Sequence, residues 1–230
     1  MVKVMIVKKY ILILSWILII ISGSCKTEIT HPDKSSEGNG ERLEGKKLYL
    51  SEYKPMNADG TVNAVIEIPA GTHEKWEVDK TDERMHLQYI DNIPRIIQYL
   101  SYPANYGMIP QSILPKDKGG DGDALDIIVL GEHLERGSVV KTKIIGMLRL
   151  IDGGEQDDKL IAVPMTGVFS EISNIIELKD KYSGVAEIIE LWYSNYKGPG
   201  ILQTKGYADR DSALTVLQYA VDSYQNNIVK

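Results

Sequence analysis

The chain has 230 residues and a formal net charge of −6, with 43% of its residues hydrophobic and 25% charged. This composition is ordinary for a folded domain, and it excludes wholesale disorder, a collagen-like repeat and a protein of many membrane spans. The acidic balance argues against a nucleic-acid partner, which needs a basic surface to follow the phosphate backbone. A single cysteine excludes both an internal disulfide framework and a cysteine-based zinc cluster.

The first 24 residues are typical of a secretory signal peptide. Three lysines and no acid precede an apolar run of eleven residues at 11–21, and small residues follow it. A run this short cannot cross a hydrocarbon core, which needs about 20 residues in a helix. Cys25 stands where a bacterial lipoprotein is cleaved and acylated, so the segment resembles a lipobox. We predict export to the periplasm or cell envelope, with a lipid anchor on Cys25 as the membrane contact. A plain signal peptide with an incidental cysteine is the alternative, and an uncleaved anchor is a third.

A polar segment follows at 25–45. Ile29 and Leu43 are its only large apolar residues, among prolines, serines, glycines and many charges. Such a segment cannot bury enough surface to fold, so we expect a tether. The rest of the chain is long enough for one domain with a real core. The predicted organisation is a signal peptide at 1–24, a tether at 25–45 and one domain at 46–230.

Within the domain, strands come first and helices last. Alternation at 62–68 predicts a strand, and a nearly continuous apolar run at 125–130 predicts a strand buried on both faces. A short strand is expected at 85–90, and a long strand region is expected at 139–151. Helical spacing predicts helices only later, at 185–196 and 211–226. This order indicates an α+β fold, and the many short strands favour a small closed barrel flanked by helices.

The glycine-aspartate segment at 119–126 carries the strongest chemical signal. Its glycines allow Asp121 and Asp123 to be displayed from a tight turn, and Asp126 follows within an apolar strand. A carboxylate in such a run needs a cation or hydrogen bonds, because burying it bare is costly. A second acidic group surrounds a glycine turn further along: Asp152, Glu155, Asp157 and Asp158. If the two groups converge, divalent metals or raised pKa values must relieve their repulsion.

The acidic loop also has other interpretations. A glycine-aspartate loop taken alone is more often a solvated turn than a metal site. An EF-hand is excluded, because the twelfth residue counted from Asp117 is Ile128, where a bidentate glutamate is needed. A calcium-stabilised turn of another kind stays open, and with it a non-catalytic lipoprotein binding module. A metal phosphohydrolase acting on nucleotides is a third hypothesis.

Cationic and phenolic side chains spread along the same chain favour a polyphosphate site beside metals. Each one alone is usually a solvated or packed side chain. Together they supply a forked donor, point charges and hydroxyl groups that suit phosphate oxygens. They are Lys75, Arg95, Tyr102, Tyr106, Lys159, Tyr196 and Lys197.

From about Val65 to the last helix, these motifs resemble the soluble family I inorganic pyrophosphatases. The landmark segments, in chain order, are 65–69, 75–80, 102–107, 121–126, 152–164 and 195–198. An Asp-Gly-Asp-x-x-Asp element is highly specific when it follows a Tyr-Pro-x-Asn-Tyr-Gly loop at this interval. The resemblance implies a five-stranded OB-like β-barrel flanked by C-terminal helices. It also implies hydrolysis of pyrophosphate to two phosphates, several Mg²⁺ ions per active site, and a homo-oligomer.

The resemblance also implies a role for each residue of the site. Asp123 is expected to be the general base for a water activated by Mg²⁺. The implied metal ligands are Asp121, Asp126, Asp152 and Asp157. The implied phosphate-binding residues are Lys75, Arg95, Tyr106, Lys159, Tyr196 and Lys197. Glu67 and Glu77 are expected to line the pocket and to order waters or metals.

Two features depart from the common family pattern. Arg95 lies seven residues before Tyr102, where several family members have eight, so its match implies a shifted loop at 92–94. The second feature is the export signal, because most members serve the cytosol. Together with the complete residue set, the signal leads to the hypothesis that the protein recovers phosphate from external pyrophosphate.

Overall fold

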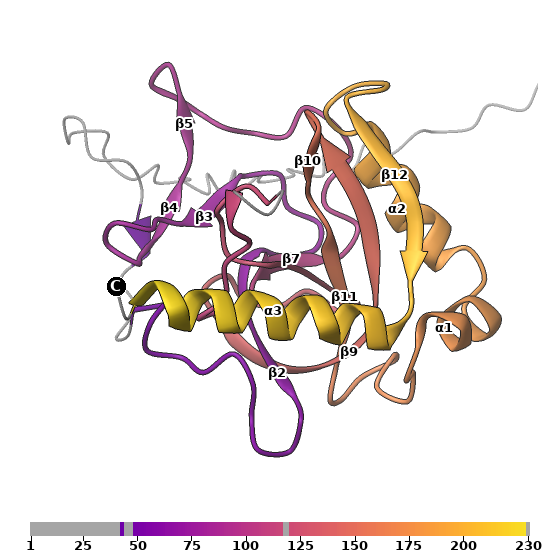
Figure 1. The fold of residues 1–230 in the computed structure, drawn as a ribbon. Helices are drawn as coiled ribbons and strands as arrows, with labels where there is room; N and C mark the ends of the chain where they lie inside the picture. Colours follow the sequence, from indigo (N-terminus) through magenta and orange to yellow (C-terminus); the bar gives the residue numbers. More distant parts are fainter. Residues whose placement is uncertain (1–41, 44–47, 117–119, 229–230) are drawn as a thin grey trace, which may run out of the picture. The chain divides into compact units, whose positions relative to one another are not determined.

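A computed structural model describes residues 42–43, 48–116 and 120–228 (Figure 1). These residues belong to one compact unit, Gly38–Lys230. The predicted signal peptide, Cys25 and most of the predicted tether lie outside the described residues. Within the described residues, the search for a helix long and apolar enough to cross a membrane finds none.

Strands dominate the first two thirds of the domain, and the helices gather near its C-terminal end (Figure 1). The first strands are β1 (Arg42–Leu43), β2 (Val62–Ile68), β3 (Trp76–Val78), β4 (Met85–Leu87), β5 (Tyr89–Ile90) and β6 (Ile93–Pro94). The next are β7 (Asn105–Met108), β8 (Asp126–Val129), β9 (Val139–Asp152), β10 (Glu155–Gln156) and β11 (Lys159–Pro164). They are followed by α1 (Ile175–Lys181), α2 (Val185–Asn195), β12 (Leu202–Ala208) and α3 (Arg210–Ile228). The predicted α+β class is confirmed.

Five strands pair in a closed circuit. β2 pairs with β7, β7 with β8, β8 with β11, β11 with β9, and β9 with β2 again. Only the β8–β11 ladder in this circuit is parallel. The 14 residues of β9 close the circuit, because its first residues pair with β2 and the following ones pair with β11. Its later residues pair with β10 and β12 as well. The predicted strand at 139–151 is therefore the central element of the sheet.

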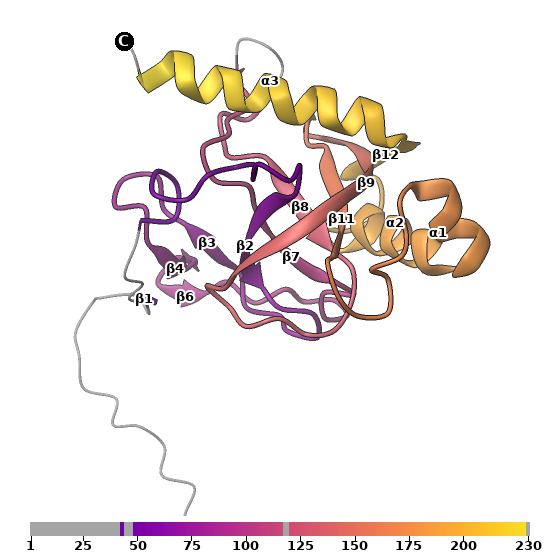
Figure 2. The ribbon, with the colours of Figure 1, turned by 90° about the horizontal axis from the view of Figure 1, so that it is seen from below.

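Helices cover the sheet on two sides (Figure 2). Side chains of β8 alternate between them: Ile127 and Val129 belong to the cluster with α3, and Ile128 belongs to the cluster with α1 and α2. All three are completely buried, as the continuous apolar run predicts. From α3 the buried residues are Ala213, Leu217, Ala220 and Val221, and from α2 they are Ala186, Ile189, Trp192 and Tyr193. The two predicted helices are confirmed at their expected places.

A three-stranded sheet in the order β1-β4-β3 lies beside the circuit, and a two-stranded hairpin of β5 and β6 leads out of it. The turn of the hairpin places Asp91 and Asn92 at φ 52° and 62°. Two consecutive positive φ values match the twist of a tight hairpin, and asparagine and aspartate tolerate them. The region that the sequence predicts as one strand at 85–90 is divided between β4 and β5, and Arg95 directly follows the hairpin.

Candidate active site

A polar cleft of about 220 Å³ lies where the ends of several strands meet the end of α2. Its wall combines carboxylates with ammonium, guanidinium and phenol groups. The residues to which the family resemblance assigns a role in the site all line this one cleft: Glu67, Lys75, Glu77, Arg95, Tyr106, Asp121, Asp123, Asp126, Asp152, Asp157, Lys159, Tyr196 and Lys197. Tyr102, in contrast, packs in the core. Segments separated by up to 130 positions in the sequence thus meet in one place.

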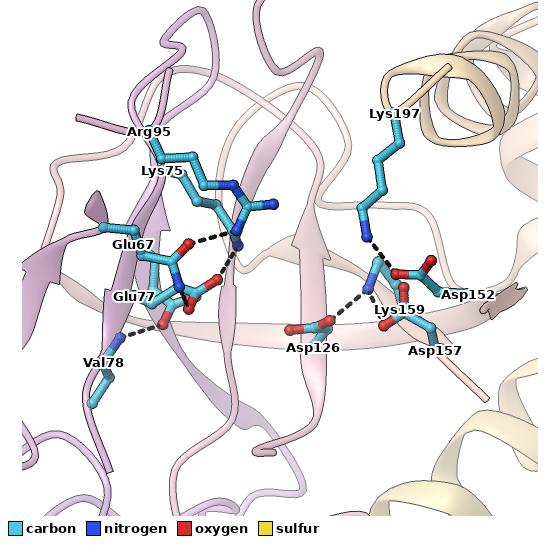
Figure 3. Close-up of polar contacts among 11 residues, drawn as sticks. Glu67, Lys75, Glu77, Val78, Arg95, Asp126, Asp152, Asp157, Lys159 and Lys197 are labelled. Atoms are coloured by element: carbon cyan, nitrogen blue, oxygen red, sulfur yellow. Dashed lines mark hydrogen bonds and ion pairs between the residues drawn. The ribbon is translucent and has the colours of Figure 1, made fainter. Parts of the chain in front are cut away.

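Lys159 binds two aspartates inside the cleft. The parallel ladder sets Leu160 opposite Ile127. The residues just before them, Lys159 and Asp126, therefore begin the two strands side by side. The Lys159 ammonium lies 2.5 Å from Asp126 Oδ2 and 2.9 Å from Asp157 Oδ1 (Figure 3). Burial alone would lower the pKa of the Lys159 ammonium, yet the two carboxylates raise it above its ordinary value, so this lysine stays charged.

The end of α2 supplies a second lysine and a phenol. Lys197 donates a hydrogen bond to Oδ2 of Asp152, the last residue of β9. The ring of Tyr196 stacks on Trp192, with centroids 4.7 Å apart and planes 9° from parallel. Burial raises the pKa of the Tyr196 phenol, so its hydroxyl keeps the proton and can donate to an anion.

On the opposite side of the cleft, Lys75 faces two glutamates (Figure 3). Its ammonium lies 2.7 Å from Glu77 Oε1. Glu67 is 4% exposed and accepts a hydrogen bond of 2.9 Å from the Val78 N–H. Burial raises the pKa of the Glu67 carboxyl to about 8, although the nearby Lys75 charge acts to lower it. This side of the cleft therefore holds a buried carboxyl that is reluctant to ionise.

Tyr106 links the two sides. The Lys75 and Lys159 ammonium groups lie 4.8 Å and 5.6 Å from the centroid of its ring. Burial raises the pKa of its phenol well above the usual value, and the Asp126 charge adds to the shift. Arg95 reaches the cleft from the residue after β6. The cleft thus presents several positive charges and a protonated phenol to any anion that enters it.

The glycine-aspartate loop lies at the mouth of the cleft. The Asp123 N–H donates to Asp121 Oδ1 at 2.8 Å, so the two carboxylates belong to one turn. Lys80 donates to the Gly122 carbonyl at 2.9 Å and also pairs with Asp123. We assigned Lys80 no role from the sequence. The sequence feature that indicates Lys80 as a residue of the cleft is its position at the end of the 75–80 segment, which also supplies Lys75.

The donor chemistry of the cleft suits a hard divalent cation. Burial raises the pKa of the Asp121 carboxyl, and the charge of Asp126 raises it further, so a cation would relieve this carboxylate. In the described residues, no three His, Cys, Asp or Glu side chains are gathered closely enough to hold a metal ion. The carboxylates are instead paired with lysines: Lys159 with Asp126 and Asp157, Lys197 with Asp152, and Lys80 with Asp123.

A cleft of this kind, with carboxylates set against lysines, an arginine and tyrosines, is the site of an enzyme that handles phosphate groups. A family model described as inorganic pyrophosphatase matches residues 64–225, and the chain belongs to that family. The inorganic pyrophosphatase of Campylobacter jejuni is 31% identical over 185 residues, which cover 77% of this chain and 100% of the relative. That of Helicobacter pylori is 32% identical over 182 residues, which cover 77% and 99%.

Solved structures agree with this assignment. The inorganic pyrophosphatase structure from Helicobacter pylori has a TM-score of 0.64 and 29% identity, and the match covers 76% of this chain and 99% of that one. A type I inorganic pyrophosphatase from P falciparum shows the same fold at a TM-score of 0.70 and 24% identity. That match covers 78% of this chain and 63% of the solved chain.

Proposed function

We propose that this protein hydrolyses inorganic pyrophosphate to two phosphates, with Mg²⁺ as its cofactor and Asp123 as the general base. One observation carries the proposal: the side chains to which the resemblance assigns a role come from distant segments of the sequence and line the same cleft. There the carboxylates that would bind Mg²⁺ line the same cleft as the cations that would bind a small polyanion.

The cations of the cleft bind the substrate. Pyrophosphate carries several negative charges on a compact frame, and charge-assisted hydrogen bonds from lysine and arginine suit its oxygens. Lys75 and Lys159 are 7% and 3% exposed, so their charges act with little screening by water. Arg95, Tyr106, Tyr196 and Lys197 complete the set of donors to the phosphate oxygens. They orient the substrate and neutralise charge that gathers on the leaving phosphate.

The residues that would hold Mg²⁺ are Asp121, Asp126, Asp152 and Asp157. When bound, the metal lowers the pKa of water and screens the phosphate charge. Glu67 and Glu77 lie across the cleft from Asp126, Asp152 and Asp157 (Figure 3) and would order waters there. Asp123 is assigned the proton of the attacking water, because it lines the cleft with the other carboxylates and its side chain is exposed to water.

Asp123→Asn tests the base directly. We expect the variant to fold normally and to lose about 10²–10⁴-fold in turnover, the usual contribution of a general base. Phosphate release measures the turnover, and thermal unfolding confirms the fold. Asp180→Asn, at an exposed aspartate on α1, is the matched control and should behave as the wild type. Near-normal turnover by Asp123→Asn would remove Asp123 from the base role.

One assay separates this function from its rivals. Phosphate release is measured from pyrophosphate, ATP and tripolyphosphate, each with Mg²⁺ or Ca²⁺. We expect rapid release from pyrophosphate with Mg²⁺ and little from the other two substrates. Release mainly from ATP would indicate a nucleotide hydrolase. Thermal stabilisation by Ca²⁺ without any release would indicate a non-catalytic binding module.

We further propose that the five-strand circuit is a small OB-like barrel and that the protein forms a homo-oligomer. The circuit supports the first proposal, because a sheet that closes on itself leaves no free edge. Sedimentation equilibrium tests the second, and a mass equal to that of one chain would contradict it.

The proposed location is the periplasm or cell envelope, with a lipid on Cys25. The basic start, short apolar run and small residues before Cys25 support it. Incorporation of labelled fatty acid into the wild type, and its loss in Cys25→Ser, would agree with this proposal. A mature protein found in the cytosolic fraction would contradict it, and with it the recovery of phosphate from external pyrophosphate.

A further inference from the structure

A half-buried glutamine behind the cleft is joined to two of its cations through the backbone. The Gln88 N–H donates to the Lys75 carbonyl at 2.9 Å, and the Gln88 carbonyl accepts from the Arg95 N–H at 2.8 Å. The Lys75 N–H closes the ring by donating to the Arg95 carbonyl at 2.9 Å. These three hydrogen bonds hold Lys75, Gln88 and Arg95 in fixed relative positions.

The side chain of Gln88 makes a second connection. Its Oε1 accepts from Arg95 Nη1 at 2.6 Å, and its Nε2 donates to Glu77 Oε2. The other oxygen of Glu77 pairs with Lys75 (Figure 3). Because a guanidinium only donates and a carboxylate only accepts, the amide can bridge them in one orientation alone. Neither a carboxylate nor an apolar side chain at position 88 can make both bonds.

The β5–β6 hairpin creates this bridge. Gln88 immediately precedes β5, and Arg95 immediately follows β6. The ladder pairs Tyr89 with Pro94, so the residues on either side of the hairpin meet at its base. Gln88 is not among the residues that line the cleft, whereas Arg95, Glu77 and Lys75 are. Gln88 can therefore act on a bound anion only through its neighbours.

We propose that Gln88 is a positioning residue for pyrophosphate: it fixes the Arg95 guanidinium and couples it through Glu77 to Lys75. The inference rests on the proposed pyrophosphatase function. An unrestrained arginine loses rotamer freedom when it binds an anion, and that loss weakens binding. The bridge removes this freedom before the substrate arrives. Arg95 and Lys75 are then already in position when the substrate binds. Loss of the bridge should therefore weaken substrate binding more than it slows the chemical step.

Gln88→Met tests the role with a side chain of similar length and no amide. We expect the KM for pyrophosphate to rise about tenfold, the worth of one hydrogen bond to a charged group, with a much smaller change in kcat. The Kd of the non-hydrolysable methylenediphosphonate, measured by calorimetry, should rise by the same factor. Gln88→Glu preserves the shape if the methionine variant fails to fold. It also raises KM, because its carboxylate repels Glu77. The control is Gln98→Met, at an exposed glutamine in the following loop, which should leave both constants unchanged.

A double-mutant cycle with Arg95→Ala separates positioning from a general loss of structure. In the Arg95→Ala background the Gln88 bridge has no guanidinium to hold, so Gln88→Met should add little further loss. Independent, multiplicative losses would overturn the inference. Gln88→Met with the KM and Kd of the wild type would also overturn the inference. The proposed function would still stand in that case, provided that the wild-type protein hydrolyses pyrophosphate. A wild-type protein that releases no phosphate from pyrophosphate would overturn both.

Discussion

Glu67 shows how one buried carboxyl changes the stability of the whole domain. It stands near the end of β2 with 4% of its surface exposed, and burial raises its pKa from 4.5 to about 8. The native state therefore holds the proton over a range in which the unfolded chain releases it. Because the native state binds more protons there, stability falls as the pH rises through this range.

Replacing Glu67 by glutamine should remove this dependence. Between about pH 5 and 8 we expect the free energy of unfolding of Glu67→Gln, relative to the wild type, to rise by up to about 1.4 kcal/mol per pH unit. Urea unfolding at several pH values measures it. Glu171→Gln, at an exposed glutamate, is the control and should show no such trend. A difference between Glu67→Gln and wild type that is constant with pH would contradict the raised pKa.

At the scale of the element, β7 shows why the Tyr-Pro-x-Asn-Tyr-Gly motif at 102–107 contains an asparagine. Asn105 is completely buried and makes four side-chain hydrogen bonds. Its Oδ1 accepts from the N–H groups of Ala70 and Leu134, and its Nδ2 donates to the carbonyls of Val129 and Glu132. The asparagine thus serves the fold, because it satisfies loop backbone groups that burial has removed from water. Tyr106 and Met108 of the same strand line the cleft instead.

Gly107 is required by the close approach of β7 and β2. A Cβ at this position would lie 1.8 Å from the Val65 carbonyl oxygen, which belongs to the neighbouring strand and cannot move aside. We expect Gly107→Ala to cost more than about 4 kcal/mol, so that little folded protein is recovered. Gly71→Ala is the control: its φ of 83° adds strain of about 1–2 kcal/mol, but no atom lies within 4 Å. Circular dichroism melting compares the two, and equal stabilities would contradict the clash.

At the scale of the whole molecule, Tyr49 is the first buried side chain among the residues whose burial the structure describes. That side chain is 5% exposed and packs in a cluster with Trp76 and Met85, and its ring stacks on Tyr53. The adjacent residue, Leu50, lines the cleft and accepts a backbone hydrogen bond of 2.9 Å from Gln111. The segment that leads into β2 therefore belongs to the folded domain.

Two truncations locate this boundary. A chain that lacks residues 1–37 should retain the wild-type melting temperature and turnover, because the compact unit begins at Gly38. A chain that lacks residues 1–60 should melt at a markedly lower temperature, because it loses the buried Tyr49. Calorimetry and phosphate release measure both. Equal stability of the two chains would show that the segment before β2 contributes nothing to the core.

Local pattern was sufficient for the long elements. The periodicity of α2 and α3 and the apolar runs of β8 and β9 each extend over enough residues to stand out from chance. The seven residues of α1 complete barely two turns, so they show little periodicity. In β12 the residues between Leu202 and Tyr207 are polar or glycine, so the strand shows no alternation of apolar and polar residues. The division of 85–90 into β4 and β5 also escaped, because it depends on which strand each piece pairs with.

Residue chemistry in the linear chain indicated a site for metals and phosphate, and the family resemblance then said which side chains belong to it. Neither could say which of them touch. The pairing of Lys159 with Asp126 follows from a parallel ladder, and the meeting of Gln88 with Arg95 follows from a hairpin. Both contacts depend on which strands pair in the folded chain, and the spacing of residues along the sequence does not determine that pairing.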